Sequence, residues 1–142
     1  MFKVRFVLVF AVFAMLLAAC SAAGSGEFQV RDAWARPGLA GGNSAVFFVI
    51  VNPGGADSLL SVSSEVAEAV ELHMTMMQDG NMQMAHQMNV PVPTGETVFK
   101  PGGLHVMLIG LKDDLKAGDT FTVALAFEKA GEQTLTVTVK DQ

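Results

Sequence analysis

The segment AVFFVIV, residues 45–51, decides the fold class that this sequence predicts. It is a nearly continuous apolar run of β-branched and aromatic residues, and it ends at the turn-forming sequence NPGG, residues 52–55. Apolar runs of about four to eight residues that stop at such a turn signal are typical of buried strands. Residues 45–51 therefore predict a strand that lies in a hydrophobic core.

Short apolar or alternating segments continue on both sides of this strand. Clusters of Gly, Pro and Asp separate them, as at 101–103 and 116–119. Residues 64–70 could form one helical turn at most, and the sequence has no long amphipathic helix. Many short strands at regular turn spacing predict an antiparallel sandwich or barrel. The further predicted strands are 28–34, 58–63, 70–76, 81–88, 97–100, 105–110, 120–127 and 133–139.

The first twenty residues do not belong to that domain. Lys3 and Arg5 precede an uncharged apolar run over 6–19, which is typical of an export signal and too short to span a membrane. The run ends at LAAC, residues 17–20, which resembles the bacterial lipoprotein processing site, with Cys20 as the lipidated first residue of the mature protein. We therefore predict a lipoprotein signal peptide at 1–19, a lipidated Cys with a flexible tether at 20–26, and one folded domain at 27–142.

The composition excludes several classes of protein. The chain has 142 residues and a formal net charge of −5, and loss of Lys3 and Arg5 with the signal leaves seven basic residues against 14 acidic ones, a net charge of −7. Seven scattered cations form no basic patch, which argues against nucleic-acid binding. The only Cys is Cys20. If it is lipidated, the domain has no thiol, which excludes disulfides, cysteine nucleophiles and thiolate metal sites.

Methionine and histidine are concentrated in one part of the chain. All three histidines and seven of the nine methionines fall within residues 73–107. A single Met more often fills a gap in a core than binds a ligand, so we expect core packing for Met74, Met76 and Met77. The DG sequence at 79–80 predicts a hairpin turn that pairs the strands on either side of it.

Strand alternation sorts the other candidates by face. His73 falls on the opposite side of its strand from Leu72, and Met84 lies on a face rich in Met and His, where a core strand usually carries branched aliphatic residues. His105 and Met107 project together from the side opposite the aliphatic residues of their strand. If these four residues served packing alone, separate strands would each have to place His or Met on the non-aliphatic side by coincidence. For two more residues of the Met84 face, packing and binding both stay open: His86 and Met88.

These donor types indicate a soft metal ion. Thioether sulfur selects Cu(I) over Zn²⁺, Mg²⁺ or Ca²⁺, and neutral imidazole binds both oxidation states of copper. A set of His and Met without Cys or convergent carboxylates therefore points to Cu(I). The same lack of Cys removes a blue-copper electron carrier and a thiolate-bridged dicopper site. The sequence contains no persuasive catalytic constellation, and we expect a binding protein rather than an enzyme.

Together with its flanking segments, this set of His and Met residues resembles the periplasmic copper chaperones of the PCu(A)C family, which supply Cu(I) during cytochrome c oxidase assembly. The resemblance covers nearly the whole chain after Cys20. It is most specific at ELH (71–73), at DGNMQM (79–84) and at KPGGLHVML (100–108). Further segments that resemble the family are DAWARP (32–37), the apolar strand that ends at Asn52, ADSL (56–59) and residues 115–127.

The resemblance also implies a ligand set. The copper motif of the family is a His, ten residues, a Met, twenty-one residues and then His-x-Met, which assigns His73, Met84, His105 and Met107 as Cu(I) ligands. Here twenty rather than twenty-one residues separate Met84 from His105. We expect the shortening in the turn-rich stretch 89–96, because a deletion inside a strand would turn every later side chain to the other face. Auxiliary candidates close to Met84 on its strand are Met82, His86 and Met88.

The fold implied by the resemblance is a cupredoxin-like Greek-key antiparallel β-sandwich. The implied function is that of an exported Cu(I) metallochaperone, lipid-anchored at the cell envelope on the periplasmic or outer face of a membrane. Its implied partner is the copper-bearing subunit of cytochrome c oxidase or an assembly factor. Two alternatives stay open: an envelope copper storage or resistance protein with the same site, and a β-sandwich adhesion or peptide-binding module whose Met surface binds apolar partners without metal.

Overall fold

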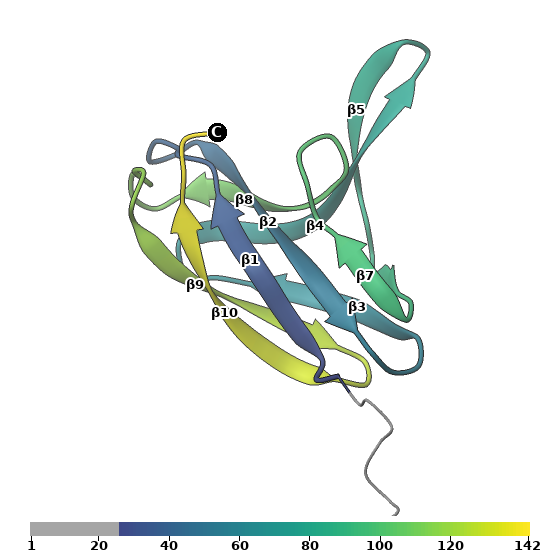
Figure 1. Ribbon diagram of the computed structural model, residues 1–142. Helices are drawn as coiled ribbons and strands as arrows, with labels where there is room; N and C mark the ends of the chain where they lie inside the picture. The colour runs from purple at the N-terminus through teal and green to yellow at the C-terminus, as the bar shows by residue number, and fades with distance from the viewer. Residues whose placement is uncertain (1–25) are drawn as a thin grey trace, which may run out of the picture.

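The computed structural model describes residues 26–142 (Figure 1). The predicted signal peptide at 1–19, the lipidated Cys20 and all of the tether except Gly26 lie outside the described residues. No helix within 26–142 is long and apolar enough to cross a membrane. The described chain is built from β-strands, as predicted.

Ten strands form the domain. All nine predicted strands are present, and β9 has the predicted bounds. The strands are β1 (Gln29–Ala35), β2 (Asn43–Asn52), β3 (Asp57–Ser63), β4 (Ala67–Gln78), β5 (Asn81–His86), β6 (Val90–Val92), β7 (Gly95–Val98), β8 (Leu104–Leu111), β9 (Thr120–Phe127) and β10 (Gly131–Val139).

Two segments differ from the prediction. β6 lies in the stretch 89–96, where only turns were expected, and its Val90 and Val92 are buried. A strand of this length is too short for an alternating pattern to reveal it. Residues 67–70 are extended rather than helical, because they form the start of β4 and pair with β8 from Ala67 onward.

The strands join in one continuous sheet that folds over into two layers (Figure 1). Their order is β5-β4-β8-β2-β1-β10-β9-β3-β6, and β7 pairs with β2. The named strand pairs are antiparallel except β1 and β10, which run parallel, so the predicted antiparallel sheet is mixed at this pair. Leu72 and Val106 of one layer belong to the same buried cluster as Val123 and Leu125 of the other. The two layers therefore enclose one hydrophobic core.

A buried carboxylate ties one end of this core together. Asp57, at the start of β3, accepts backbone N–H bonds of 2.7–2.9 Å from Ser58, Lys129 and Ala130. Burial raises the pKa of the Asp57 carboxyl, but the three N–H donors stabilise its charged form, and the net pKa shift is downward. The side chain thus links β3 to the turn between β9 and β10.

The hairpin of β4 and β5 extends beyond the rest of the sheet (Figure 1). The ladder between β4 and β8 ends at Met74, and from Met76 onward β4 pairs with β5 alone. Asp79 and Gly80 have φ angles of 51° and 78°, the left-handed conformations of the predicted two-residue turn. We refer to residues 76–83 as the arm, and to the rest of the domain as the body.

The arm overturns part of a packing prediction. Met76 and Met77 are 45% and 68% exposed, so the expected core packing of these two residues is wrong. Met74 is half-buried. The side assignment itself holds, since Met74 and Met76 alternate with His73 along β4. The prediction fails because β8 stops beside Met74, and beyond that point only β5 accompanies β4.

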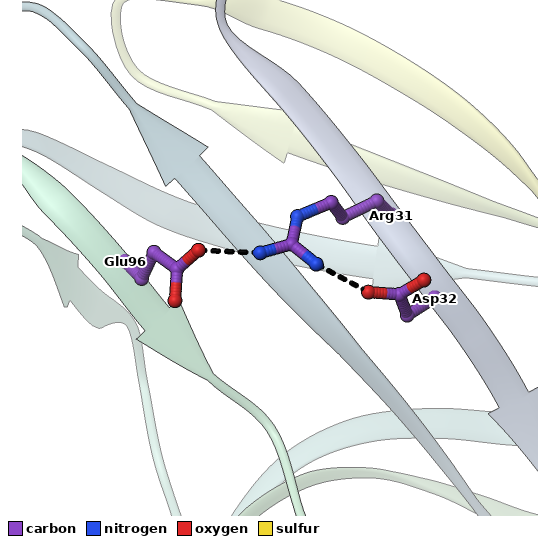
Figure 2. Close-up of polar contacts among 3 residues, drawn as sticks. All are labelled: Arg31, Asp32 and Glu96. Atoms are coloured by element: carbon purple, nitrogen blue, oxygen red, sulfur yellow. Dashed lines mark hydrogen bonds and ion pairs between the residues drawn. The ribbon is translucent and has the colours of Figure 1, made fainter.

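An exposed ion-pair cluster lies on the surface of the body (Figure 2). Arg31 of β1 pairs with its neighbour Asp32 and with Glu96 of β7, so the guanidinium connects β1 and β7 across β2. Because all three side chains are exposed, solvent screens the attraction and the cluster contributes little to stability. It leaves the candidate functional residues untouched.

Candidate metal centre

The three histidines stand in one row across three adjacent strands. His73 of β4 lies directly opposite His86 of β5 on one side and His105 of β8 on the other. The ring centroid of His73 is 5.8 Å from each of the other two. Directly paired residues share one face of a sheet, so the predicted common face of His73 and His105 is confirmed. The shortened spacing before His105 therefore leaves its phase unchanged.

Met84 and Met107 flank this row. Met84 lies opposite Thr75, two residues from His73 along β4, and Met107 lies opposite Glu71, two residues from His73 in the other direction. Met84, His105 and Met107 line one hollow in the surface. His105 is only 4% exposed, whereas Met84 is 60% exposed. The hollow thus has a buried imidazole at its base and a solvent-accessible thioether at its rim.

The surroundings of His105 fix which of its nitrogens is free. Nδ1 of His105 lies 3.1 Å from the carbonyl oxygen of Gly103, and a carbonyl only accepts, so Nδ1 carries the proton and donates it. Nε2 then holds a lone pair. Burial lowers the pKa of His105, the Gly103 hydrogen bond opposes this shift, and the proximity of His73 and Arg36 adds to the lowering. His105 is therefore a neutral imidazole with one nitrogen ready to bind a metal.

His73 is oriented in the complementary way. Its Nε2 lies 2.8 Å from a carboxylate oxygen of Glu71, so Nε2 donates and Nδ1 keeps the lone pair. The Glu71 carboxyl has a lowered pKa, first because of this hydrogen bond. Nδ1 of His73 is buried and has no hydrogen-bond partner. An unpartnered buried nitrogen costs stability, and a bound metal ion would satisfy it.

The separation of the two rings suits a shared metal ion. With metal–nitrogen bonds of about 2.0 Å, two imidazoles on one ion have ring centroids no more than roughly 6.4 Å apart, and the centroids of His73 and His105 are 5.8 Å apart. No group of three or more His, Cys, Asp or Glu side chains within 26–142 is arranged to hold a metal. A site at this face therefore depends on the thioethers of Met84 and Met107 for its remaining donors.

The auxiliary candidates divide between two places. Met82 lines a hollow that adjoins the first one and also contains Met84 and His105. His86 and Met88 line a different hollow, at the side of Glu71 that faces β3. The structure therefore places Met82 beside Met84 and His105, and His86 beside His73, whereas the hollow that Met88 lines contains none of Met84, His105 and Met107.

Two residues of the site escaped the sequence reasoning. Arg36 lines both hollows beside His105, with its guanidinium carbon 5.6 Å from the ring centroid of Phe47. Glu71 orients His73. Both residues could have been identified from the sequence. Arg36 belongs to the DAWARP segment, which resembles the PCu(A)C family. Glu71 and His73 are two residues apart, a spacing that places both on one face of a strand.

Comparison with known proteins assigns this domain to a family. The model of the family described as "Putative lipoprotein LpqE-like" matches residues 28–139. The chain belongs to the LpqE-like family. The protein named "Putative lipoprotein Lxx21020" of Leifsonia xyli subsp. xyli is 35% identical over 117 residues, which cover 80% of this chain and 69% of that protein. "Uncharacterized protein RP573" of Rickettsia prowazekii is 31% identical over 114 residues, which cover 75% of this chain and 62% of that protein.

Solved structures share the fold of this LpqE-like chain. The copper-bound PCuAC domain from PmoF2 has a TM-score of 0.67 at 24% identity, covering 82% of this chain and 95% of that domain. Cu(I)-bound DR1885 from Deinococcus radiodurans has a TM-score of 0.62 at 25% identity, covering 86% of this chain and 85% of that one. The predicted resemblance to PCu(A)C proteins and the predicted all-β fold class are both confirmed.

Proposed function

We propose that this protein is a Cu(I)-binding metallochaperone, with His73, Met84, His105 and Met107 as its copper ligands. The observation that carries the proposal is the convergence of Met84, His105 and Met107 on one hollow, with the ring of His73 directly beside that of His105. The unpartnered Nδ1 of His73 and the free Nε2 of His105 supply the two nitrogen donors. The copper-bound PmoF2 domain and Cu(I)-bound DR1885, which share the fold, support the choice of metal.

The donor set favours Cu(I) over other available cations. Two imidazoles and two thioethers are neutral, and thioether sulfur is a soft donor that binds hard or borderline divalent ions poorly. The guanidinium of Arg36 lies beside the hollow and disfavours divalent ions more than a monovalent one. The site therefore supports Cu(I) binding with little affinity for Zn²⁺.

The exposure of Met84 supports transfer rather than permanent storage. A partner that offers thiolates can approach the rim, form a Cu–S bond and displace the neutral thioether of Met84. The copper stays Cu(I) and no proton leaves the chaperone ligands, so the step is a ligand exchange and not an enzymatic reaction. A storage protein would instead surround its metal.

We further propose export and anchoring through Cys20, with copper delivered to the copper-bearing subunit of cytochrome c oxidase or to an assembly factor. The lipoprotein description of the family supports the anchor. Mass spectrometry of the native protein tests it. Diacylglycerol on an N-terminal Cys20 is expected, and an unmodified soluble chain would contradict the proposal.

A metal titration of the mature protein tests the function. We expect one tightly bound Cu(I) per chain, nitrogen and sulfur scattering in X-ray absorption, and loss of the metal to a thiolate acceptor. Retention of copper against that acceptor would favour storage or resistance. No binding of Cu(I) at all would favour the metal-free adhesion module.

A further inference from the structure

The arm carries two methionines that the fold does not use. Met77 and Met82 are 68% and 67% exposed, close to the turn at the tip of the hairpin (Figure 1). An exposed side chain gains no burial energy, and polar or β-branched residues serve an exposed hairpin at least as well. Neither strand pairing nor core packing therefore accounts for Met at these two positions.

Their positions relative to each other are suited to a ligand pair. Met77 and Met82 lie directly opposite each other across β4 and β5. Directly opposite residues have Cβ atoms about 4.5–5.5 Å apart, and two sulfurs on one metal ion lie up to about 4.6 Å apart at metal–sulfur distances near 2.3 Å. Two flexible Met side chains at this spacing can hold one ion between them.

The pair is also continuous with the candidate metal centre. Met77 lies two residues from Thr75 and four from His73 along β4, and Met82 lies two residues from Met84 along β5, so all of them share one face. Met82 and Met84 line the same hollow as His105. Thioethers therefore follow one another from the tip of the arm to the buried imidazole.

We propose that Met77 and Met82 form a second, outer Cu(I) site that passes copper to and from Met84. The inference rests on the proposed function, because it takes the inner site as source or destination. In inward transfer a Cu–S bond to Met84 forms as one to Met82 breaks, and outward transfer is the reverse exchange. The copper remains Cu(I), and no electron or proton is exchanged. Two neutral donors bind more weakly than the four of the inner site, so the outer site fills second.

The main competing explanation is an apolar contact surface for a partner protein, since Met also suits adaptable interfaces. The chain supplies a matched control. Met76 is 45% exposed on the same strand, but it lies opposite Gln83 on the other face of the arm. A general attraction of copper to exposed thioethers affects Met76 as much as its neighbours, whereas the outer site affects only Met77 and Met82.

Methionine-methyl NMR of the mature protein during Cu(I) titration locates the metal. The first equivalent is expected to shift the methyl signals of Met84 and Met107, and the second those of Met77 and Met82, with Met76 unchanged. If the methyl signals of Met77 and Met82 do not shift, or if that of Met76 shifts equally, the proposed outer site is wrong. If the methyl signals of Met84 and Met107 do not shift, the proposed inner ligand set is wrong, whether or not the signals of Met77 and Met82 shift.

Transfer kinetics test the role of the outer site. Met77→Leu is expected to keep first-equivalent Cu(I) affinity within about twofold, because Leu keeps volume and apolarity and Met77 lines neither of the hollows beside His105. Its transfer to a small thiolate acceptor should be about tenfold slower, which corresponds to about 1.4 kcal/mol in the barrier. Met76→Leu should transfer like the parent. Equal transfer rates for all three proteins would refute the relay.

Discussion

The two ends of β4 show how differently one strand can be used. From Ala67 to Met74 the strand pairs with β8, and Leu72 on its inner side is 3% exposed. From Met76 onward it pairs with β5 alone, and Met76 on that same side is 45% exposed. Alternation thus determines the side to which a residue points, while the neighbouring strands determine whether that side is covered.

The largest expected effect separates body from arm by stability. Leu72→Ala should lower the free energy of unfolding by about 3 kcal/mol, because it leaves a cavity in the shared core. Met76→Ala should change it by no more than about 0.5 kcal/mol. Chemical denaturation of both variants makes the measurement. Similar losses in the two variants would mean that the arm is covered in solution.

Asp57 gives a second test of the body. Asp57→Asn should lower the free energy of unfolding at neutral pH by about 2 kcal/mol, because the three backbone donors lose a charged acceptor. The folded pKa of Asp57 is lowered, so its contribution is full above the unfolded pKa of about 3.9 and disappears as the pH falls. Denaturation curves of parent and variant should therefore converge in acid. A constant gap down to strongly acidic pH would rule out this role of the charge.

Copper affinity should depend on residues at the junction of body and arm. Met84→Leu and Met107→Leu should each reduce Cu(I) affinity by at least about tenfold, or about 1.4 kcal/mol. The fold should lose less than about 1.5 kcal/mol, because Leu keeps the volume and apolarity. Chelator competition and thermal melts measure the two effects. Met74→Leu is the control, and loss of copper in that variant alone would place the site on the opposite face.

The pH dependence of binding gives the smallest and most gradual effect. His105 must be neutral to bind copper, and its lowered pKa keeps it neutral below the ordinary value of about 6.5. Copper affinity should therefore begin to fall at a lower pH than for a free imidazole, and the thioethers should retain part of it. In the metal-free protein the same shift makes stability decline as the pH drops below about 6.5, because the unfolded imidazole takes up a proton more readily. Affinity that is flat into strong acid would exclude the histidines as ligands.

The sequence predicted nine of the ten strands and the common face of His73 and His105, because both depend on local sequence pattern. The hairpin turn was also predictable, since DG at 79–80 matches a two-residue turn. The exposure of Met76 and Met77 was not, because it depends on where β8 ends in space. The free nitrogens of the two histidines were equally hidden, since they depend on contacts with Glu71 and Gly103.

The parallel pairing of β1 with β10 bears on the distance between the start of the domain and the arm. Because both strands run the same way, the chain enters the body at one pole and leaves it at the other, and the arm rises at the pole remote from the start of β1 (Figure 1). Seven residues of β1 alone span about 23 Å at roughly 3.3 Å per residue. The exposed methionines of the arm therefore lie at the opposite end of the body from the start of β1, which is the end nearer in sequence to the proposed anchor at Cys20.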